Sequence, residues 1–239
     1  MIRDLVFKAW IYGSMGVLGI LFIPAIFLPK GAVLFGIRLW TRGVRWGLRV
    51  IYDVRTEFRG LEHLPDQPCL IAAKHQSMFD TVVTFLFMPP HVTIMKRELL
   101  RAPVFGQYAA RIGTIAIDRG GSAKTLKKMA RIAARRIKAG LSVLIYPEGT
   151  RRDPGAPPDY KIGVYALYKD MNVPCTPLAT NSGLYWPQRG RRVEPGVIVY
   201  EVLPQLPTGL DRPAFMARLE GVIEPATNGL LAEAERETV

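Results

Sequence analysis

The chain has 239 residues, 49% of them hydrophobic and 22% charged, which suits one α/β domain with an appendage or two small domains and excludes global disorder. The formal net charge of +12 predicts an anionic partner: a nucleic acid, anionic lipid headgroups or a phosphorylated substrate. The only cysteines, Cys69 and Cys175, lie outside any Cys/His cluster, which argues against a disulfide framework and structural zinc.

The N-terminal part of the chain has two membrane-type segments. The run from Ile11 to Leu28 has no charged residue, and its 18 residues are at the short limit for a spanning helix. Pro24 and the apolar continuation after it are unlike a removable signal peptide. Residues 32–52 then combine tryptophans with arginines spaced on one helical face, which is typical of a basic interfacial helix. These arginines are Arg38, Arg42, Arg45 and Arg49.

Basic residues flank the apolar run on both sides: Arg3 and Lys8 precede it, and Lys30 follows it. By the positive-inside rule neither end favours crossing the membrane, so we predict a helical hairpin that enters one leaflet. A single transmembrane anchor is the alternative. Either arrangement explains the basic charge better than nucleic-acid binding, for which the chain has no recognisable motif.

After Asp53, short β-like runs alternate with helical stretches, which predicts an α/β fold with a mostly parallel or mixed sheet flanked by helices. We divide the chain into a membrane-associated helical region (1–52), an α/β domain (53–225) and an acidic, mobile tail (226–239). The predicted strands are residues 54–60, 69–74, 91–96, 113–119, 141–146, 173–180 and 197–203. The predicted helices are residues 77–88, 97–111, 122–140 and 211–223.

Polar loops follow three of the predicted strands, and in open α/β sheets such loops form the sites. In "KHQSMFD" (74–80), Ser77 and Asp80 form an S-x-x-D capping box, which by itself gives Asp80 a structural reason to exist. The same cap would let the Asp80 carboxylate reach one ring nitrogen of His75 and leave the other as a general base for an alcohol. Because no G-x-S-x-G occurs, direct transfer between two bound substrates is favoured over a covalent acyl-enzyme.

The other two loops have the chemistry of an anion site. "DRGGS" (118–122) offers glycines and a helix N-terminus, and "YPEGTR" (146–151) offers a glycine, a hydroxyl and an arginine fork. For each loop, an ordinary turn with solvated arginines is the alternative, and neither loop is a P-loop. The candidate residues are Arg119 in the first loop and Glu148, Gly149, Thr150 and Arg151 in the second.

Four blocks in this order resemble those of the glycerolipid acyltransferase family, in particular its bacterial 1-acylglycerol-3-phosphate acyltransferases. An isolated H-x-x-x-x-D is weak evidence, but four ordered blocks with suitable spacing are specific, and a membrane-binding N-terminal region is typical of the family. One departure is Lys74, where many relatives have asparagine, and the role of this position stays open. The blocks are "KHQSMFD" (74–80), "GTIAIDR" (113–119), "YPEGTR" (146–151) and "VPCTPLATNSG" (173–183).

The resemblance implies that His75 is the general base and Asp80 its partner. It implies that Pro177 and its block shape the acyl or acceptor pocket, and it implies no metal and no cofactor besides the thioester co-substrate. The residues implied to bind the phosphate of the acceptor are Arg119, Glu148, Gly149, Thr150 and Arg151, with Lys96 as a further candidate.

The predicted activity is transfer of a fatty acyl group from acyl-CoA or acyl carrier protein to the 2-hydroxyl of lysophosphatidic acid, which gives phosphatidic acid. We expect it at the cytoplasmic face of the inner membrane, with the protein monotopic or held by a single anchor. The expected partners are anionic membrane lipids and the two substrates, with no nucleic acid. The alternatives are another acceptor, such as lyso-ornithine lipid, or a non-catalytic membrane lipid-binding protein.

Overall fold

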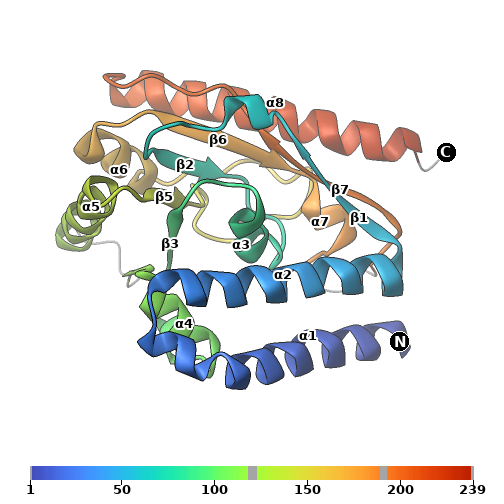
Figure 1. Ribbon diagram of the computed structural model, residues 1–239. Helices are drawn as coiled ribbons and strands as arrows, with labels where there is room; N and C mark the ends of the chain where they lie inside the picture. The colour runs from blue at the N-terminus through green and yellow to red at the C-terminus, as the bar shows by residue number, and fades with distance from the viewer. Residues whose placement is uncertain (1, 118–122, 189–192, 238–239) are drawn as a thin grey trace.

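The computed structural model describes residues 2–117, 123–188 and 193–237, which form a seven-stranded sheet in the order β1-β7-β6-β2-β5-β3-β4 (Figure 1). Neighbouring strands run parallel except β6 and β7, which are antiparallel. The mostly parallel or mixed sheet flanked by helices is therefore confirmed. The strands are β1 (Val54–Arg59), β2 (Leu70–Ala73), β3 (His91–Lys96), β4 (Ile115–Ile117), β5 (Ser142–Ile145), β6 (Cys175–Thr180) and β7 (Gly196–Val202).

The helices are α1 (Ile2–Leu21), α2 (Lys30–Tyr52), α3 (Asp80–Val83), α4 (Phe105–Ile112), α5 (Ala123–Lys138), α6 (Gly163–Met171), α7 (Ser182–Tyr185) and α8 (Arg212–Glu237). Short 3-10 helices are η1 (Ile23–Phe27), η2 (Leu61–His63), η3 (Thr84–Leu86) and η4 (Arg97–Arg101). The predicted helix over 77–88 is thus divided into α3 and η3, and that over 97–111 into η4 and α4. Helices α6 and α7 were not predicted.

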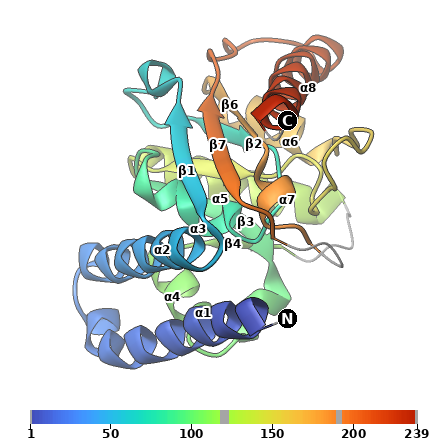
Figure 2. The same ribbon diagram turned by 90° about the vertical axis from the view of Figure 1, so that its right-hand side faces the viewer.

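Two apolar layers lie on opposite faces of the sheet, because successive strand residues point to opposite sides. In β2, Leu70 belongs to the layer formed with α5, α6 and α8, whereas Ile71 belongs to the layer formed with α1, α2 and α3. In β5, Val143 belongs to the first of these layers and Leu144 to the second. Figure 2 shows α8 and the α1–α2 pair on opposite sides of the sheet.

Helices α1 and α2 form the predicted hairpin, side by side along the lower edge of the molecule in Figure 1. The Trp10 indole N–H of α1 donates to the Gly43 carbonyl of α2 over 2.9 Å. The apolar run from Ile11 to Leu28 does not continue as one helix: α1 ends at Leu21, and Pro24 lies in η1. Proline lacks the amide donor and clashes with the preceding turn, so the chain bends there.

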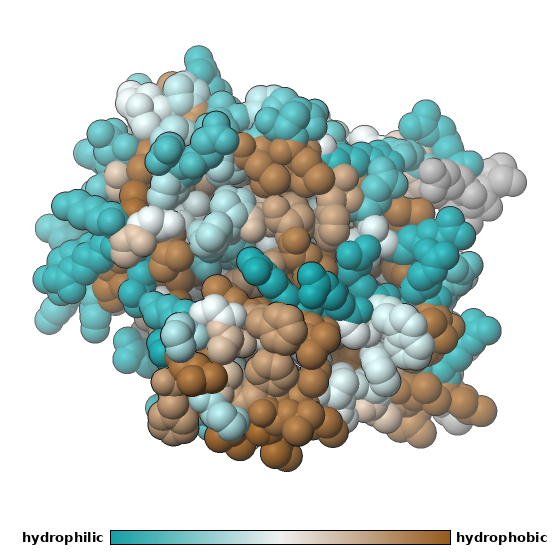
Figure 3. Space-filling view, in the orientation of Figure 1, coloured by the Kyte–Doolittle hydropathy of each residue, from teal (hydrophilic) through white to brown (hydrophobic). Residues whose placement is uncertain are grey.

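The hairpin exposes an unusual number of large apolar side chains, which form the brown lower surface in Figure 3, with hydrophilic residues directly above it. Helix α1 is also long and apolar enough to cross a membrane by length and composition. Exposed apolar surface of this extent on one face marks an interaction site. Its residues include Leu5, Tyr12, Val17, Ile20, Leu21, Phe27, Phe35, Trp46 and Val50.

The prediction of a mobile tail after Pro225 is wrong for residues 226–237, which continue α8. Leu230 and Ala234 are buried in the two apolar layers, and the Arg59 guanidinium binds both oxygens of Glu233 at 2.8 and 2.7 Å. The stability gained from this packing offsets the loss of the backbone hydrogen bond that Pro225 removes from the helix.

Candidate active site

The loops after β2 and β5 meet at the carboxyl edge of the sheet, because these strands are parallel neighbours. The first loop carries His75 and the second carries Arg152. The Arg152 backbone N–H donates to the His75 carbonyl over 2.8 Å, so the two loops are joined directly. The strand order places β3 next to β5 and β4 beyond β3, so the end of β4 lies further along the same edge from the end of β2.

His75 and Asp80 are in contact: the distance between His75 Nδ1 and Asp80 Oδ2 is 2.9 Å. The same carboxylate oxygen accepts the backbone N–H groups of Gln76 and Ser77, each at 2.8 Å. The loop is therefore folded around the carboxylate, with the histidine held at one side of it.

The second oxygen of Asp80 accepts hydrogen bonds from the β6 and β7 part of the chain. Asp80 Oδ1 accepts the Ser182 hydroxyl of α7 and the Tyr200 hydroxyl of β7, each at 2.7 Å. Burial of the Asp80 side chain opposes ionisation, but these donors and His75 outweigh it and lower the pKa of the carboxyl group. Asp80 is thus an ionised, acceptor-only group, which places a proton on His75 Nδ1 and leaves Nε2 with a free lone pair.

The ring of His75 is fixed by a second contact. It stacks on the Tyr146 ring from the loop after β5, with 3.9 Å between the ring centroids and 21° between the planes. The His75 side chain is 12% exposed, whereas that of Asp80 is 2% exposed. The imidazole therefore has one edge against a buried carboxylate, one face against a tyrosine, and limited access to solvent.

Only half of the predicted S-x-x-D capping box is present, and the helix starts later than predicted, with Phe79 as its N-cap. Ser77 Oγ accepts the Phe79 backbone N–H at 3.2 Å while Asp80 binds the Ser77 backbone N–H, but α3 begins only at Asp80. The serine nearest to His75 is thus used in the cap, and the Ser182 hydroxyl is directed to Asp80. Neither serine is hydrogen-bonded to the histidine as a nucleophile would be.

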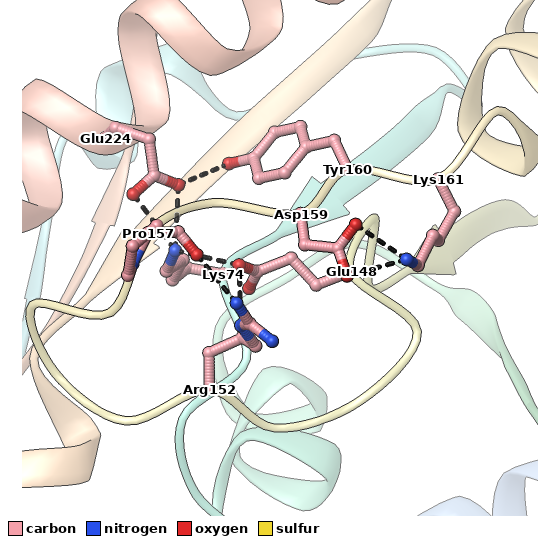
Figure 4. A network of polar contacts seen from close by, with 8 residues as sticks. All are labelled: Lys74, Glu148, Arg152, Pro157, Asp159, Tyr160, Lys161 and Glu224. Carbon is pink, nitrogen blue, oxygen red and sulfur yellow. Dashed lines mark hydrogen bonds and ion pairs between the residues drawn. The ribbon is translucent and has the colours of Figure 1, made fainter.

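A second polar cluster lies beside this pair and centres on Lys74, the residue before His75 (Figure 4). Lys74 Nζ contacts Glu148 Oε1 at 3.2 Å and both carboxylate oxygens of Glu224 at 2.8 and 3.0 Å. The Tyr160 hydroxyl donates to Glu224 over 2.8 Å, and Arg152 Nε lies 3.9 Å from Glu148 Oε1. The cluster therefore joins the ends of β2 and β5 to helix α8.

Glu148 has one oxygen paired and one unpaired. Its side chain is 2% exposed, and Oε2 has no hydrogen-bond partner among the described residues, as is also true of Arg152 Nε. Burial raises the pKa of Glu148, the cation of Lys74 opposes the rise, and the nearby Glu224 adds to it. A buried carboxylate oxygen without a donor is costly, so it marks a position where a donor from outside the chain would bind favourably.

The other predicted binding residues lie at the same sheet edge. Gly149 adopts the left-handed backbone region with φ 66°, which favours glycine at that turn. Thr150 is exposed and Arg151 half-buried, while Lys96 ends β3, the strand next to β5. Arg119 and the rest of the predicted loop over 118–122 lie outside the described residues. Among the described residues, no group of three His, Cys, Asp or Glu side chains could hold a metal ion.

Comparison with known proteins shows which family this arrangement belongs to. The family model described as Acyltransferase matches residues 55–181. The 1-acyl-sn-glycerol-3-phosphate acyltransferase of Pseudomonas aeruginosa is 36% identical over 97% of this chain and 91% of its own length. The chain belongs to the acyltransferase family. The family resemblance of the four sequence blocks is thereby confirmed.

More distant relatives are also acyltransferases. The 1-acyl-sn-glycerol-3-phosphate acyltransferase alpha of Homo sapiens is 32% identical over 72% of this chain and 63% of its own length. The crystal structure of the 1-acyl-sn-glycerophosphate acyltransferase from Thermotoga maritima superposes with a TM-score of 0.78, covering 96% of this chain and 97% of that one. At 19% sequence identity, the second likeness shows a shared fold.

Three residues of the acyltransferase site were not found from the sequence. Ser182 lies in the fourth block, but its bond to Asp80 depends on β6 lying beside β2. Tyr200 lies on a strand with no motif, and Tyr146 was read only as part of a turn. No signal in one sequence identifies the two tyrosines, because their roles come from strand order.

We predict that Tyr200→Phe lowers the free energy of unfolding by about 1–2 kcal/mol, because Asp80 then loses a buried donor. Tyr146→Phe is the matched control: its hydroxyl is buried without a partner among the described residues, so removing it should leave stability unchanged or increase it. Denaturant unfolding followed by circular dichroism measures both variants. Equal effects of the two substitutions would contradict this assignment of the Asp80 donors.

Proposed function

We propose that the protein transfers a fatty acyl group from a thioester donor, acyl-CoA or acyl carrier protein, to the 2-hydroxyl of lysophosphatidic acid. The observation that carries this proposal is the contact between His75 Nδ1 and the buried Asp80 carboxylate, within a chain of the acyltransferase family. Relatives named as acyltransferases of 1-acyl-sn-glycerol 3-phosphate support the choice of acceptor.

In the proposed reaction, His75 Nε2 removes the proton from the 2-hydroxyl as its oxygen attacks the thioester carbonyl carbon. Asp80 stays ionised and stabilises the imidazolium that forms. The carbon–sulfur bond then breaks, and the imidazolium returns the proton to the departing thiolate. A positioned general base of this kind contributes roughly 10²–10⁴ in rate.

For the acceptor headgroup, we propose Arg151 and Lys96 as cationic ligands, with Arg119 as a further one from the loop after β4. Within the described residues, Arg151 and Lys96 form no ion pair, so both are free to bind a phosphate. The Thr150 hydroxyl would contribute a donor. The Gly149 N–H already donates to the Tyr146 carbonyl over 2.9 Å, so Gly149 would contribute only the close approach of its backbone. Glu148 Oε2, which is buried and unpaired, would accept from a glycerol hydroxyl.

We propose that the α1–α2 hairpin seats the protein in one leaflet at the cytoplasmic face of the membrane. Helix α1 and the following η1 are held by α4: the Tyr108 hydroxyl donates to the Gly19 carbonyl of α1 over 2.6 Å, and Arg111 donates to the Ile26 carbonyl of η1. If α1 crossed the bilayer, it would carry α2 and its arginines toward the hydrocarbon, which is costly. A monotopic arrangement avoids that cost.

Anionic lipid headgroups are the proposed partners of the arginines on α2. A groove of about 480 Å³ between α2 and β1 is lined by Arg42, Arg45, Arg49, Arg55 and the half-exposed Trp46. These arginines have no carboxylate partner among the described residues. The α2 arginine predicted to join them, Arg38, differs: its guanidinium donates to the Phe85 carbonyl over 3.0 Å.

The central test is acyl transfer by purified protein with lysophosphatidic acid and each type of donor. We expect His75→Ala to lose turnover by about 10²-fold or more with folding intact, because the proposed general base for the acceptor hydroxyl is then lost. His63→Ala is the matched control, since His63 lies in η2 after β1, at the opposite edge of the sheet from His75, and its side chain is 37% exposed. Transfer to lyso-ornithine lipid instead, or lipid binding without transfer from any donor, would refute the proposed acceptor or the proposed activity.

Arg151→Ala should raise the KM for lysophosphatidic acid by about tenfold with little change in kcat, because a charged ligand to the phosphate is lost. The matched control is Arg131→Ala, because Arg131 is exposed on α5. The neighbouring Arg152 is unsuitable as a control because it lies beside Glu148. Steady-state kinetics against acceptor concentration measure this. An unchanged KM would exclude Arg151 as a phosphate ligand.

Replacing Arg42 and Arg49 by glutamate should reduce binding to anionic vesicles, while binding to zwitterionic vesicles changes little. Each basic residue near an anionic surface contributes about 1 kcal/mol, and reversal also adds repulsion. Co-sedimentation with vesicles of both compositions is the measurement. Equal losses on the two vesicle types would show that the arginines do not bind anionic headgroups.

A further inference from the structure

Lys74 is a buried cation shared between two carboxylates that come from distant parts of the chain. Its side chain is 2% exposed, as is that of Glu148, and Glu224 is 15% exposed. Glu148 comes from the loop after β5, whereas Glu224 comes from α8, at the residue before Pro225. The contact therefore reaches from the residue beside His75 to the C-terminal helix.

Stability alone is a weak explanation for this cluster. Removing charged groups from water is expensive, and well-packed apolar residues in place of a buried ion pair are often neutral or stabilising. A buried cluster of this kind is better explained by what it fixes. Here it fixes one oxygen of Glu148 and leaves the other, Oε2, buried and without a donor among the described residues.

The two carboxylates are held differently by their surroundings. Both oxygens of Glu224 contact Lys74, and the Tyr160 hydroxyl adds a donor, so Glu224 is the anchored partner. Glu148 is held through Oε1 only. Lys74 thus links Glu148 to α8, so the orientation of Glu148 depends on where α8 holds Lys74.

We propose that Lys74 and Glu224 are positioning residues, which orient Glu148 toward the hydroxyl-bearing acceptor by a buried charge bridge from α8. This inference rests on the acceptor role proposed for Glu148 and adds residues outside the predicted site. It also gives a role to position 74, which the sequence left open. Neither residue touches the reacting atoms.

The first test is Lys74→Met, which keeps the length of the side chain and removes the charge. We expect the KM for lysophosphatidic acid to rise about tenfold and kcat to change less, because a misplaced ligand for the acceptor weakens binding. Lys161→Met is the matched control. Lys161 pairs with Asp159 over 2.6 Å in the same loop region, but both side chains are about half exposed, so we expect an unchanged KM.

The pH dependence separates positioning from loss of packing. Without Lys74, two buried carboxylates face each other, and they are tolerated only while they share a proton. The kcat/KM of Lys74→Met relative to wild type should therefore fall as the pH rises. The charged or titratable groups that face Glu148 are Lys74 directly after β2, Glu224 of α8, and Arg152 with Tyr160 of the loop after β5.

A double variant tests whether Glu224 acts through Lys74. Glu224→Gln keeps an oxygen for Tyr160 and Lys74, so it should fold even if Lys74→Met does not. Combining it with Lys74→Met removes one of the two carboxylates that repel each other, so the double variant should have a lower acceptor KM than Lys74→Met alone. If the KM change of the double variant equalled the product of the two single changes, the two residues would act independently.

Binding measured without turnover keeps this inference distinct from the proposed function. In a His75→Ala background, Lys74→Met should raise the Kd for lysophosphatidic acid about tenfold, as measured by calorimetry. An unchanged Kd and KM in Lys74→Met, with a flat pH ratio, would overturn the positioning role. Absence of acyl transfer by the wild-type protein would instead overturn the proposed function.

Discussion

The buried carboxylate of Asp80 is the constraint on which the catalytic edge of the sheet depends. A charged group with 2% exposure is tolerated only when its oxygens are satisfied, and the donors come from its own loop, from α7 and from β7. The charge therefore requires three separate segments to meet at one point. The same requirement fixes the tautomer of His75, so the fold and the proposed base chemistry share one cause.

Lys74 forms a second centre of buried charge one residue away, with the opposite sign. Lys74 and His75 directly follow β2, and their side chains enter different surroundings. His75 stacks on Tyr146, whereas Lys74 reaches Glu148 and Glu224. The proposed base and the proposed acceptor ligand are thus held by independent sets of contacts, which allows one to be altered without loss of the other.

Local sequence signals predicted the parts of the fold whose causes are local. The helix over 122–140, the bond from Asp80 back to the Ser77 N–H and the polar loops after strands were predictable because each depends on residues close in the chain. The continuation of α8 past Pro225 was not, because Leu230, Glu233 and Ala234 are held by distant partners. The same limit applies to Tyr200 and Glu224: each enters its cluster through strand order and helix packing, which periodicity does not report.

The position of the hairpin connects the membrane proposal to the site. Helix α2 packs on α3 and η3, which directly follow the His75 loop, and Val44 and Leu48 of α2 share an apolar layer with Val83 of α3. Arg38 adds a polar tie to η3 through the Phe85 carbonyl. A hairpin seated in a leaflet would therefore hold the His75 loop at a set height above the bilayer. An acceptor with a phosphate headgroup and an acyl chain meets that geometry, since its reactive hydroxyl lies at the boundary between the two.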